Sequence, residues 1–427
     1  MTFNKTKGRN DMSNNFGKWG WSTILMCLVA YFIAGGVSTD GLNIYVNALS
    51  GIRGWSTASM LSFSTYGGWI GVILTFILGH ITAKNMKATK PIMIITLLIT
   101  AVLMYFYGHT TSFPLYAVCV AGVSCISVGY SQICPNNIQT LWFPRRKAIA
   151  LGFSTIGFPL CTMLWPNVTN RLMGSFGVGG MFTAIAIFIA VYALVLIPWC
   201  KVTPEEVNVA PDNDPMSAEE IRASMKAMAE YKSPWTMKRL LKEKRTWFIG
   251  VGLGLMWMVT VAIVSRLVAR LLAMGLERGS AVGMLSVVGF FGIFGSYLWG
   301  WLDQKLTTKT ASLLYCAWYV VALICLIFMQ STVLMYIGVF MVGISVGGIC
   351  NLIPSMVGSI FGRKDFAAAN RFISALTKAL CACAYLYMGK MEAAVGMTGA
   401  YVGLIVICVV AALLIALIKP FANTEHA

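Results

Sequence analysis

The apolar residues of this chain are gathered into long blocks separated by short polar turns. Each block is long enough to cross the hydrocarbon core of a bilayer as a helix, the element that satisfies its own backbone groups there. Only 11% of the residues are charged and 58% are hydrophobic, whereas a soluble domain carries about 25% charged residues. The sequence therefore predicts an all-α polytopic membrane protein with twelve transmembrane helices, at 21–49, 57–80, 91–108, 113–135, 146–167, 179–199, 247–272, 280–302, 310–330, 332–356, 367–391 and 397–419.

The two halves of the chain repeat each other. The turn at Gly79–Lys84 corresponds to Gly300–Lys305, and the turn at Trp142–Lys147 corresponds to Phe361–Lys364. Each pair is separated by about 220 residues, which indicates an internal duplication. Such repeats are common in transporters, whose site lies between the halves near the membrane midplane. We expect a tail, a six-helix bundle, a central loop, a second six-helix bundle and a tail, at 1–20, 21–199, 200–246, 247–419 and 420–427.

The net charge of +17 is explained by how the protein is oriented in the membrane, and it does not indicate binding to nucleic acid. Most of the 32 Lys and Arg residues fall in alternate turns, the central loop and the tails. This is the positive-inside pattern, so both termini are predicted to be cytoplasmic in a cell-membrane protein. The central loop opens a short helix at Ser217–Glu220, which fits a capping box, and its later basic part would lie on anionic headgroups. The predicted partners are the bilayer and a small substrate, with no nucleic acid, and the chain is predicted to be a monomer.

Nothing in the sequence predicts an enzyme, a metal site or a cofactor. The twelve cysteines lie in or at the edge of apolar blocks, where cysteine acts as a small apolar filler. The three histidines are scattered over an inner turn, an outer turn and the tail, at His80, His109 and His426.

A lysine interrupts the apolar block 367–391. Lys378 lies roughly 18–20 Å beyond the charged turn Arg363–Asp365, at about 1.5 Å of rise per residue. That distance places its ammonium group near the midplane, where a charge costs about 2.5–3.5 kcal/mol on insertion scales. Both helix ends are too distant for the side chain to reach water. We interpret Lys378 as the group that binds an anionic substrate, with a structural pair as the alternative.

Two arginines share one face of the block 247–272. Arg266 and Arg270 are four residues apart and lie close to its outer end. They anchor the helix at the interface or form an outer vestibule that attracts anions. Four aromatic residues are candidate walls of the substrate cavity, with core packing as their alternative role: Tyr45, Tyr66, Tyr130 and Trp257.

Asp40 is the one carboxylate that we place at membrane depth, after a predicted break at Gly35-Gly36. It is the candidate coupling residue, because proton symport needs a titratable group that changes environment. If Asp40 faces solvent, anion exchange or uniport is favoured. If it reaches Lys378, the pair could open on protonation and give anion–proton symport.

Three motifs resemble those of the major facilitator superfamily, and specifically of its oxalate/formate antiporter branch, which is related to monocarboxylate carriers. Trp142–Gly152 resembles the basic turn of that branch. Phe361–Asp365 with Asn370 resembles its start of helix eleven, in which the lysine of the pattern falls at Lys378. Gly54–Ser56 before the second helix also fits. The resemblance covers the whole chain and implies alternating access between two six-helix bundles.

The departures from the branch bear on the substrate and on gating. Members that carry oxalate have an arginine in helix eight, and the block 280–302 has none, which favours a monocarboxylate. The superfamily usually has an aspartate in the first inner turn, where this chain has Ala83, while Asp303 takes the corresponding place in the second half. The resemblance implies gating roles for the basic residues of the inner turns, Arg145, Arg146, Arg363 and Lys364.

We therefore predict a secondary transporter for a small organic anion, working as an exchanger or a proton-coupled carrier. Two other functions remain open. A carrier of bulky amphipathic anions, such as sterol acids or drugs, would use the same lysine. A membrane sensor built on a carrier fold would need a signalling domain, for which the loop at 200–246 is short.

Overall fold

The computed structural model describes residues 16–214, 216–328 and 331–419. Residues 1–15 of the predicted N-terminal tail and all of the predicted tail 420–427 therefore lie outside the described residues. The rest of the predicted N-terminal tail, residues 16–20, contains the start of helix α1. The first half contains α1 (Gly17–Gly35), η1 (Gly36–Asp40), α2 (Leu42–Arg53), α3 (Thr57–Lys84), η2 (Met86–Ala88), α4 (Thr89–His109), α5 (Phe113–Val128), η3 (Gly129–Ile133), α6 (Cys134–Trp142), α7 (Lys147–Thr155) and α8 (Gly157–Trp199). The second half contains α11 (Lys244–Ala273), α12 (Arg278–Lys305), α13 (Thr308–Ile327), α14 (Thr332–Val346) and α15 (Gly348–Ala416).

Glycine residues divide the longest helices into separate membrane spans. The described residues contain 9 helical runs long and apolar enough to cross a membrane. Gly177 divides α8, and Gly362 and Gly396 divide α15, each with φ near +70° and ψ near 175°. Only glycine adopts that backbone conformation readily. The three breaks give twelve spans, which confirms the all-α fold predicted from the apolar blocks.

The predicted break at Gly35-Gly36 is present as well. The helix widens into the π-helical turn η1, which ends at Asp40. A Cβ atom on Gly36 would lie 2.3 Å from the ring of Trp165, so this position has no room for a side chain. The first span therefore continues through α2, past a bulge that turns Asp40 toward α8.

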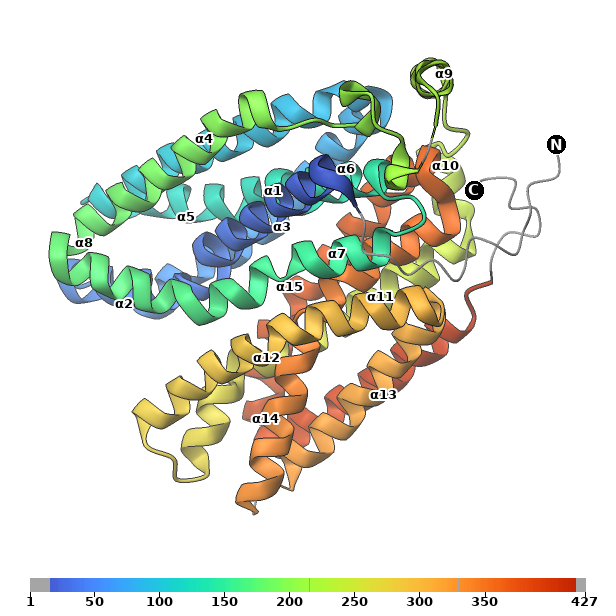
Figure 1. The fold of residues 1–427 in the computed structure, drawn as a ribbon. Coiled ribbons are helices and arrows are strands. Elements are labelled where there is room, and N and C mark those ends of the chain that lie inside the picture. Colours follow the sequence, from blue (N-terminus) through green and yellow to red (C-terminus); the bar gives the residue numbers. More distant parts are fainter. Residues whose placement is uncertain (1–15, 215, 329–330, 420–427) are drawn as a thin grey trace.

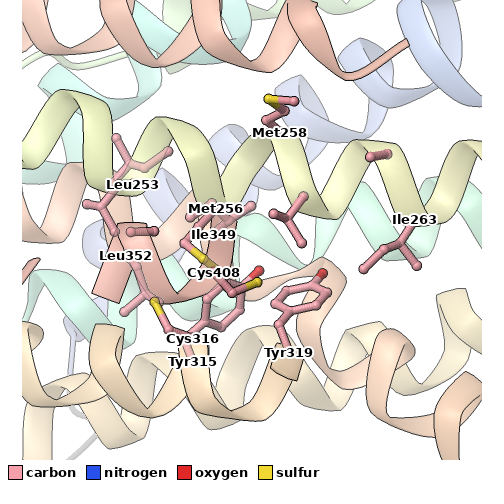
Figure 2. Close-up of a cluster of buried hydrophobic side chains, with 14 of the residues drawn as sticks. Leu253, Met256, Met258, Ile263, Tyr315, Cys316, Tyr319, Ile349, Leu352 and Cys408 are labelled. Atoms are coloured by element: carbon pink, nitrogen blue, oxygen red, sulfur yellow. The ribbon is translucent and has the colours of Figure 1, made fainter. Parts of the chain in front are cut away.

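Each half has its own hydrophobic core. The first extends from Phe16 to Val202 and the second from Trp235 to Ile418. In the second core, Tyr315 and Tyr319 lie among aliphatic side chains (Figure 2), and the Tyr315 hydroxyl donates to the Ser345 carbonyl at 2.9 Å. The two halves lie one above the other in Figure 1, and they diverge toward the end opposite α9 and α10. We call the end that carries α9 and α10 the loop end.

The central loop is ordered over its described residues and packs on the loop end. It contains η4 (Pro204–Val207), η5 (Pro211–Asn213), α9 (Ala218–Glu230) and α10 (Met237–Lys242). The predicted capping box at the start of α9 is confirmed, because the Ser217 and Glu220 side chains each bond the backbone of the other. A second capping box, Thr203 with Glu206, starts η4. The loop is thus built from short capped helices.

Candidate functional site

A small chamber, lined mostly by apolar surface with several uncharged polar groups, lies between the two halves. Its volume is about 30 Å³, enough for one or two water molecules. Tyr31, Gln132 and Asn136 line it from the first half, and Trp257 and Thr377 from the second. The Tyr31 hydroxyl donates to Asn136 Oδ1 at 2.8 Å. Gln132 Oε1 is buried and has no hydrogen-bond partner among the described residues. The chamber therefore offers uncharged hydrogen-bonding groups among aromatic side chains from both halves.

Lys378 follows the lining residue Thr377 in the α15 segment 363–395 and is not itself a lining residue. It is linked to the chamber through Cys381, which lies near both Lys378 and the lining residue Cys350. Its ammonium group lies near the thiols of Cys381 on its own helix and Cys125 on α5 of the other half. No hydrogen bond or ion pair of Lys378 occurs within the described part of the chain. The structure thus places a cation without a carboxylate partner where the halves meet.

Asp40 is engaged elsewhere. Its carboxylate accepts a hydrogen bond from the Thr162 hydroxyl at 3.0 Å, and it lies near Cys161. Among the described residues it forms no ion pair with Lys378. The two groups that the sequence suggested as a possible coupled pair are therefore separate in this conformation.

The four candidate wall residues take different places. Trp257 lines the chamber. Tyr45 and Tyr130 are fully buried in the core of the first half, where the Tyr45 hydroxyl donates to Gly36 and accepts from the Trp165 indole at 2.7 Å. Tyr66 is 59% exposed on α3. In this conformation Tyr45 and Tyr130 therefore pack as core residues, and neither lines the chamber.

The two arginines of α11 have partners at the end opposite the central loop. Arg266 forms an ion pair with Glu392 at 2.6 Å. Arg270 donates to the carbonyls of Leu326 and Ile327 at the end of α13, and it lines a cavity of about 960 Å³ between the ends of α11, α12 and α14. Glu392 lies one residue beyond the predicted end of the eleventh block at residue 391, so the hydropathy pattern does not place it in the membrane. The helix continues to Gly396 and brings this carboxylate to Arg266.

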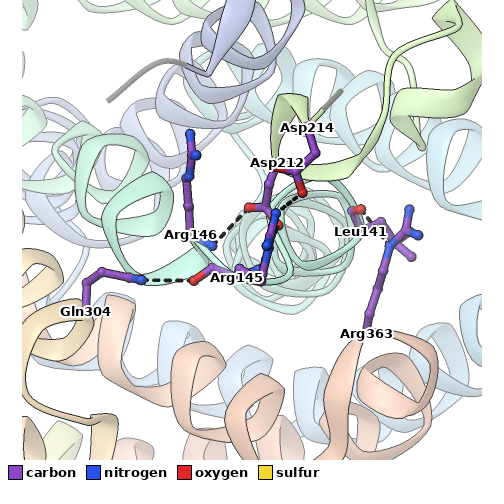
Figure 3. A network of polar contacts seen from close by, with 7 residues as sticks. All are labelled: Leu141, Arg145, Arg146, Asp212, Asp214, Gln304 and Arg363. Atoms are coloured by element: carbon purple, nitrogen blue, oxygen red, sulfur yellow. Dashed lines mark hydrogen bonds and ion pairs between the residues drawn. The ribbon is translucent and has the colours of Figure 1, made fainter. Parts of the chain in front are cut away.

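The basic turns at the loop end are held by the central loop (Figure 3). The Asp212 carboxylate accepts hydrogen bonds from the backbone N–H groups of Arg145 and Arg146 at 2.9 and 3.0 Å. The Arg145 side chain forms ion pairs with Asp212 and Asp214. Burial raises the pKa of the Asp212 carboxyl, and these hydrogen bonds oppose the shift. The sequence pattern assigns no role to Asp212, and the only local signal is the turn-forming run Pro211-Asp212-Asn213-Asp214 around it.

Other contacts of the loop end join the two halves directly. Gln304 of α12 donates to the Arg145 carbonyl at 3.1 Å (Figure 3). Arg363 donates to the Leu141 carbonyl and to Glu205 of the loop, both at 2.8 Å. A Cβ atom on Gly300 would lie 2.5 Å from the Ala148 carbonyl oxygen, so α12 and α7 are in backbone contact. The loop end is closed.

The remaining predicted gating residues also lie at the loop end. Asp303 is buried and accepts from the Thr308 hydroxyl at 2.6 Å. Lys364 lies over the ring of Tyr231 at 5.3 Å. The Tyr231 hydroxyl donates to Asp365, and burial together with that carboxylate raises the pKa of Tyr231 to about 12. This hydroxyl therefore remains a donor.

The comparisons with known proteins agree with this architecture. Residues 134–384 match the family model of the Major Facilitator Superfamily. The proton:xylose symporter XylE, solved with 6-bromo-6-deoxy-D-glucose, superimposes with a TM-score of 0.74 at 12% identity, over 93% of this chain and 95% of that chain. The human organic anion transporter MFSD10 (TETRAN) gives a TM-score of 0.66 at 14% identity, over 93% and 98%. No curated protein sequence matches the chain.

The family model covers more than half of the chain, and the two solved structures share its fold over nearly their whole length. The part of the chain that the structure describes has twelve apolar spans in two halves once the three glycine breaks are counted, with a chamber between the halves. This is the architecture of a multi-pass membrane transporter. The chain belongs to the major facilitator superfamily.

Proposed function

We propose that this protein is a secondary transporter that carries a small organic anion, a monocarboxylate, by alternating access between its two halves. The observation that carries the proposal is Lys378, a cation between the halves with no carboxylate partner among the described residues. A charge at the bilayer centre costs about 2.5–3.5 kcal/mol on insertion scales. An anionic substrate would offset that cost.

The chamber near Lys378 supports a small substrate. Its volume of about 30 Å³ suits a compact group better than a sterol ring, and its lining contains no carboxylate that would repel an anion. The motifs at Trp142–Gly152 and Phe361–Asp365 resemble the oxalate/formate antiporter branch and point the same way. The solved structure of an organic anion transporter with this fold is consistent with an anionic substrate.

The placement of Asp40 favours exchange or uniport over proton symport through an Asp40–Lys378 pair. Because Asp40 bonds Thr162, Lys378 has no internal counter-ion in this conformation. Moving an empty carrier would take an unpaired ammonium through a dry state, which is costly. Obligatory exchange of one anion for another avoids that step. The basic residues of the loop end further suggest that this end faces the cytoplasm.

One observation favours a second candidate function. The cavity of about 960 Å³ beside Arg270 is large enough for a bulky amphipathic anion. It lies within the second half, at the end away from the central loop, so such a molecule would enter there before it reached the chamber.

Counterflow into proteoliposomes tests the proposal. Vesicles preloaded with each of formate, acetate, lactate, pyruvate, oxalate, succinate, an aromatic acid and a sterol acid are given the labelled acid outside. We expect wild type to exchange one of the small monocarboxylates and Lys378→Gln to lose at least about 99% of that flux, a loss of about 2.7 kcal/mol or more.

The matched control is Lys390→Gln, which removes the same charge from an exposed position on the same helix. It should transport like wild type, and Lys378→Arg should retain part of the flux. Full flux in Lys378→Gln would overturn the role of Lys378. Exchange of only the sterol or aromatic acid would support the second candidate.

A further inference from the structure

One of the contacts between the two halves at the loop end joins a histidine to an arginine. Arg371 of α15 is only 7% exposed, and its Nη1 lies 3.0 Å from Nδ1 of His80 on α3. Its Nη2 donates to the Trp235 carbonyl of the central loop at 3.0 Å. A Cβ atom on Gly79 would lie 2.4 Å from the Arg371 Cβ atom, so the two helices touch here. One arginine therefore ties α3, α15 and the loop together.

The chemistry of this contact fixes the charge of the imidazole. A guanidinium group has five N–H donors and no acceptor, and it stays charged in proteins. His80 Nδ1 must therefore accept the hydrogen bond, which leaves the ring neutral with its proton on Nε2. If Nδ1 gained a proton, two donors and two positive charges would face each other across 3.0 Å. The contact exists only while His80 is neutral.

The surroundings offer little to offset a second charge. On α3 itself, Lys84 lies one turn beyond His80. On the neighbouring η2 and α2 the charged residues are Lys87 and Arg53, while α5 and η3 contribute only tyrosine and cysteine as titratable groups. The carboxylates of α15 are Asp365, which Tyr231 binds, and Glu392, which pairs with Arg266 at the other end. The other basic side chains of α15 are Arg363, Lys364, Lys378 and Lys390. The adjoining loop contributes the basic residues Lys232, Lys238, Arg239 and Lys242 and the carboxylates Glu230 and Glu243, of which Glu243 pairs with Arg245.

His80 is exposed at the loop end, so protons from that side can reach it. Imidazole is the side chain that changes its charge most readily near neutral pH. We propose that His80 and Arg371 form a pH-sensitive latch between the halves. The neutral imidazole holds α3 against α15, and its protonation releases the two helices. Acidification on the loop side therefore shifts the protein toward the conformation that is open at that end.

Hydrogen–deuterium exchange with mass spectrometry tests the latch on the full-length protein in lipid nanodiscs. The informative peptides cover residues 76–84 and 368–376, and each rate is divided by the intrinsic exchange rate at the same pH. We expect protection of both peptides in wild type to fall at least about fivefold between pH 7.5 and pH 5.5, the lower range of allosteric couplings.

The decisive variant is His80→Asn. Its carboxamide oxygen occupies the place of Nδ1 and accepts from Arg371 at both pH values, so protection should stay constant. His109→Asn is the matched control, because His109 is exposed at the opposite end and bonds the Tyr105 carbonyl. It should behave like wild type.

Two results would overturn the proposal: protection that does not fall in wild type, or an equal fall in His80→Asn. Arg371→Gln gives a second check that does not depend on the histidine variant. It keeps a neutral donor to Nδ1 and removes the like charge, so its fall in protection should be smaller than that of wild type. The measurement needs no substrate, and its outcome is separate from that of the anion-transport test.

Discussion

Gly300 and Gly152 bring α12 and α7 into backbone contact at the closed end. A Cβ atom on Gly300 would lie 2.5 Å from the Ala148 carbonyl oxygen and 3.1 Å from the Gly152 Cα atom. Backbone atoms cannot swing aside, so Gly300→Ala should destabilise this conformation by about 1–3 kcal/mol, the usual cost of overpacking. Equilibrium unfolding in detergent micelles measures the change.

The control for Gly300→Ala is Gly68→Ala in α3, where a Cβ atom would meet nothing within 4 Å. This substitution should be neutral or stabilise by up to about 1 kcal/mol through the unfolded chain. Equal stability of Gly300→Ala and wild type would show that the halves are not in backbone contact at this point.

The positive side chains within the spans differ in whether they have an ion pair or hydrogen bonds with neighbouring groups. Arg266 has Glu392, Arg270 has carbonyls at the end of α13, and Arg371 has His80 and Trp235. Lys378 has no such partner among the described residues, and it directly follows Thr377, which lines the chamber. This difference is the physical reason for assigning substrate binding to Lys378 rather than to the arginines.

The long helices depend on glycine where they break. Gly362 has φ 74° and ψ 178° at the joint between the α15 segments 348–361 and 363–395. A residue with a Cβ atom is strained there by about 1–3 kcal/mol. Gly362→Ala should therefore lower the free energy of unfolding by that amount, measured by denaturant titration in micelles.

Gly389 provides the comparison within the same helix. It has an ordinary helical backbone, and a Cβ atom there would meet nothing within 4 Å. Gly389→Ala should stabilise the helix by up to about 1 kcal/mol, because alanine loses less backbone entropy than glycine. If both variants changed stability in the same direction and by the same amount, the strain at Gly362 would not be real.

The central loop acts on the whole molecule because it contacts both halves. Asp212 holds the turn of the first half, while Glu205 binds Arg363 of the second, which also bonds Leu141 of the first. Arg363→Gln should weaken the closed loop end and expose Cys350, which lines the chamber. We expect labelling of Cys350 by an impermeant maleimide from the loop side to be about tenfold faster. That factor corresponds to about 1.4 kcal/mol and is below the cost of breaking a buried ion pair.

Peptide mass spectrometry reads the label on Cys350, and Glu205→Gln should give the same direction of change. The neighbouring Lys364→Gln is the control, since Lys364 is exposed and lies over Tyr231 without bridging the halves. Labelling of Arg363→Gln at the wild-type rate would mean that the other contacts of the loop end suffice to keep it closed.

The sequence by itself determined the features that depend on neighbours along the chain. Block length and hydropathy predicted twelve spans, and Lys378 was recognisable as a charge within an apolar run. Gly35-Gly36 indicated the bulge at η1, and Ser217–Glu220 indicated the start of a helix. Each of these follows from local chemistry, because a helix in lipid must satisfy its own backbone.

Only the tertiary structure decided which side chains meet across helices that are far apart in the chain. In the structure Asp40 accepts a hydrogen bond from Thr162 and forms no pair with Lys378, whereas Arg266 forms an ion pair with Glu392. Tyr45 and Tyr130 pack in a core, and His80 contacts Arg371. Hydropathy shows that a helix is in the membrane but not which face turns toward which neighbour, since in lipid small residues and close packing decide how helices associate.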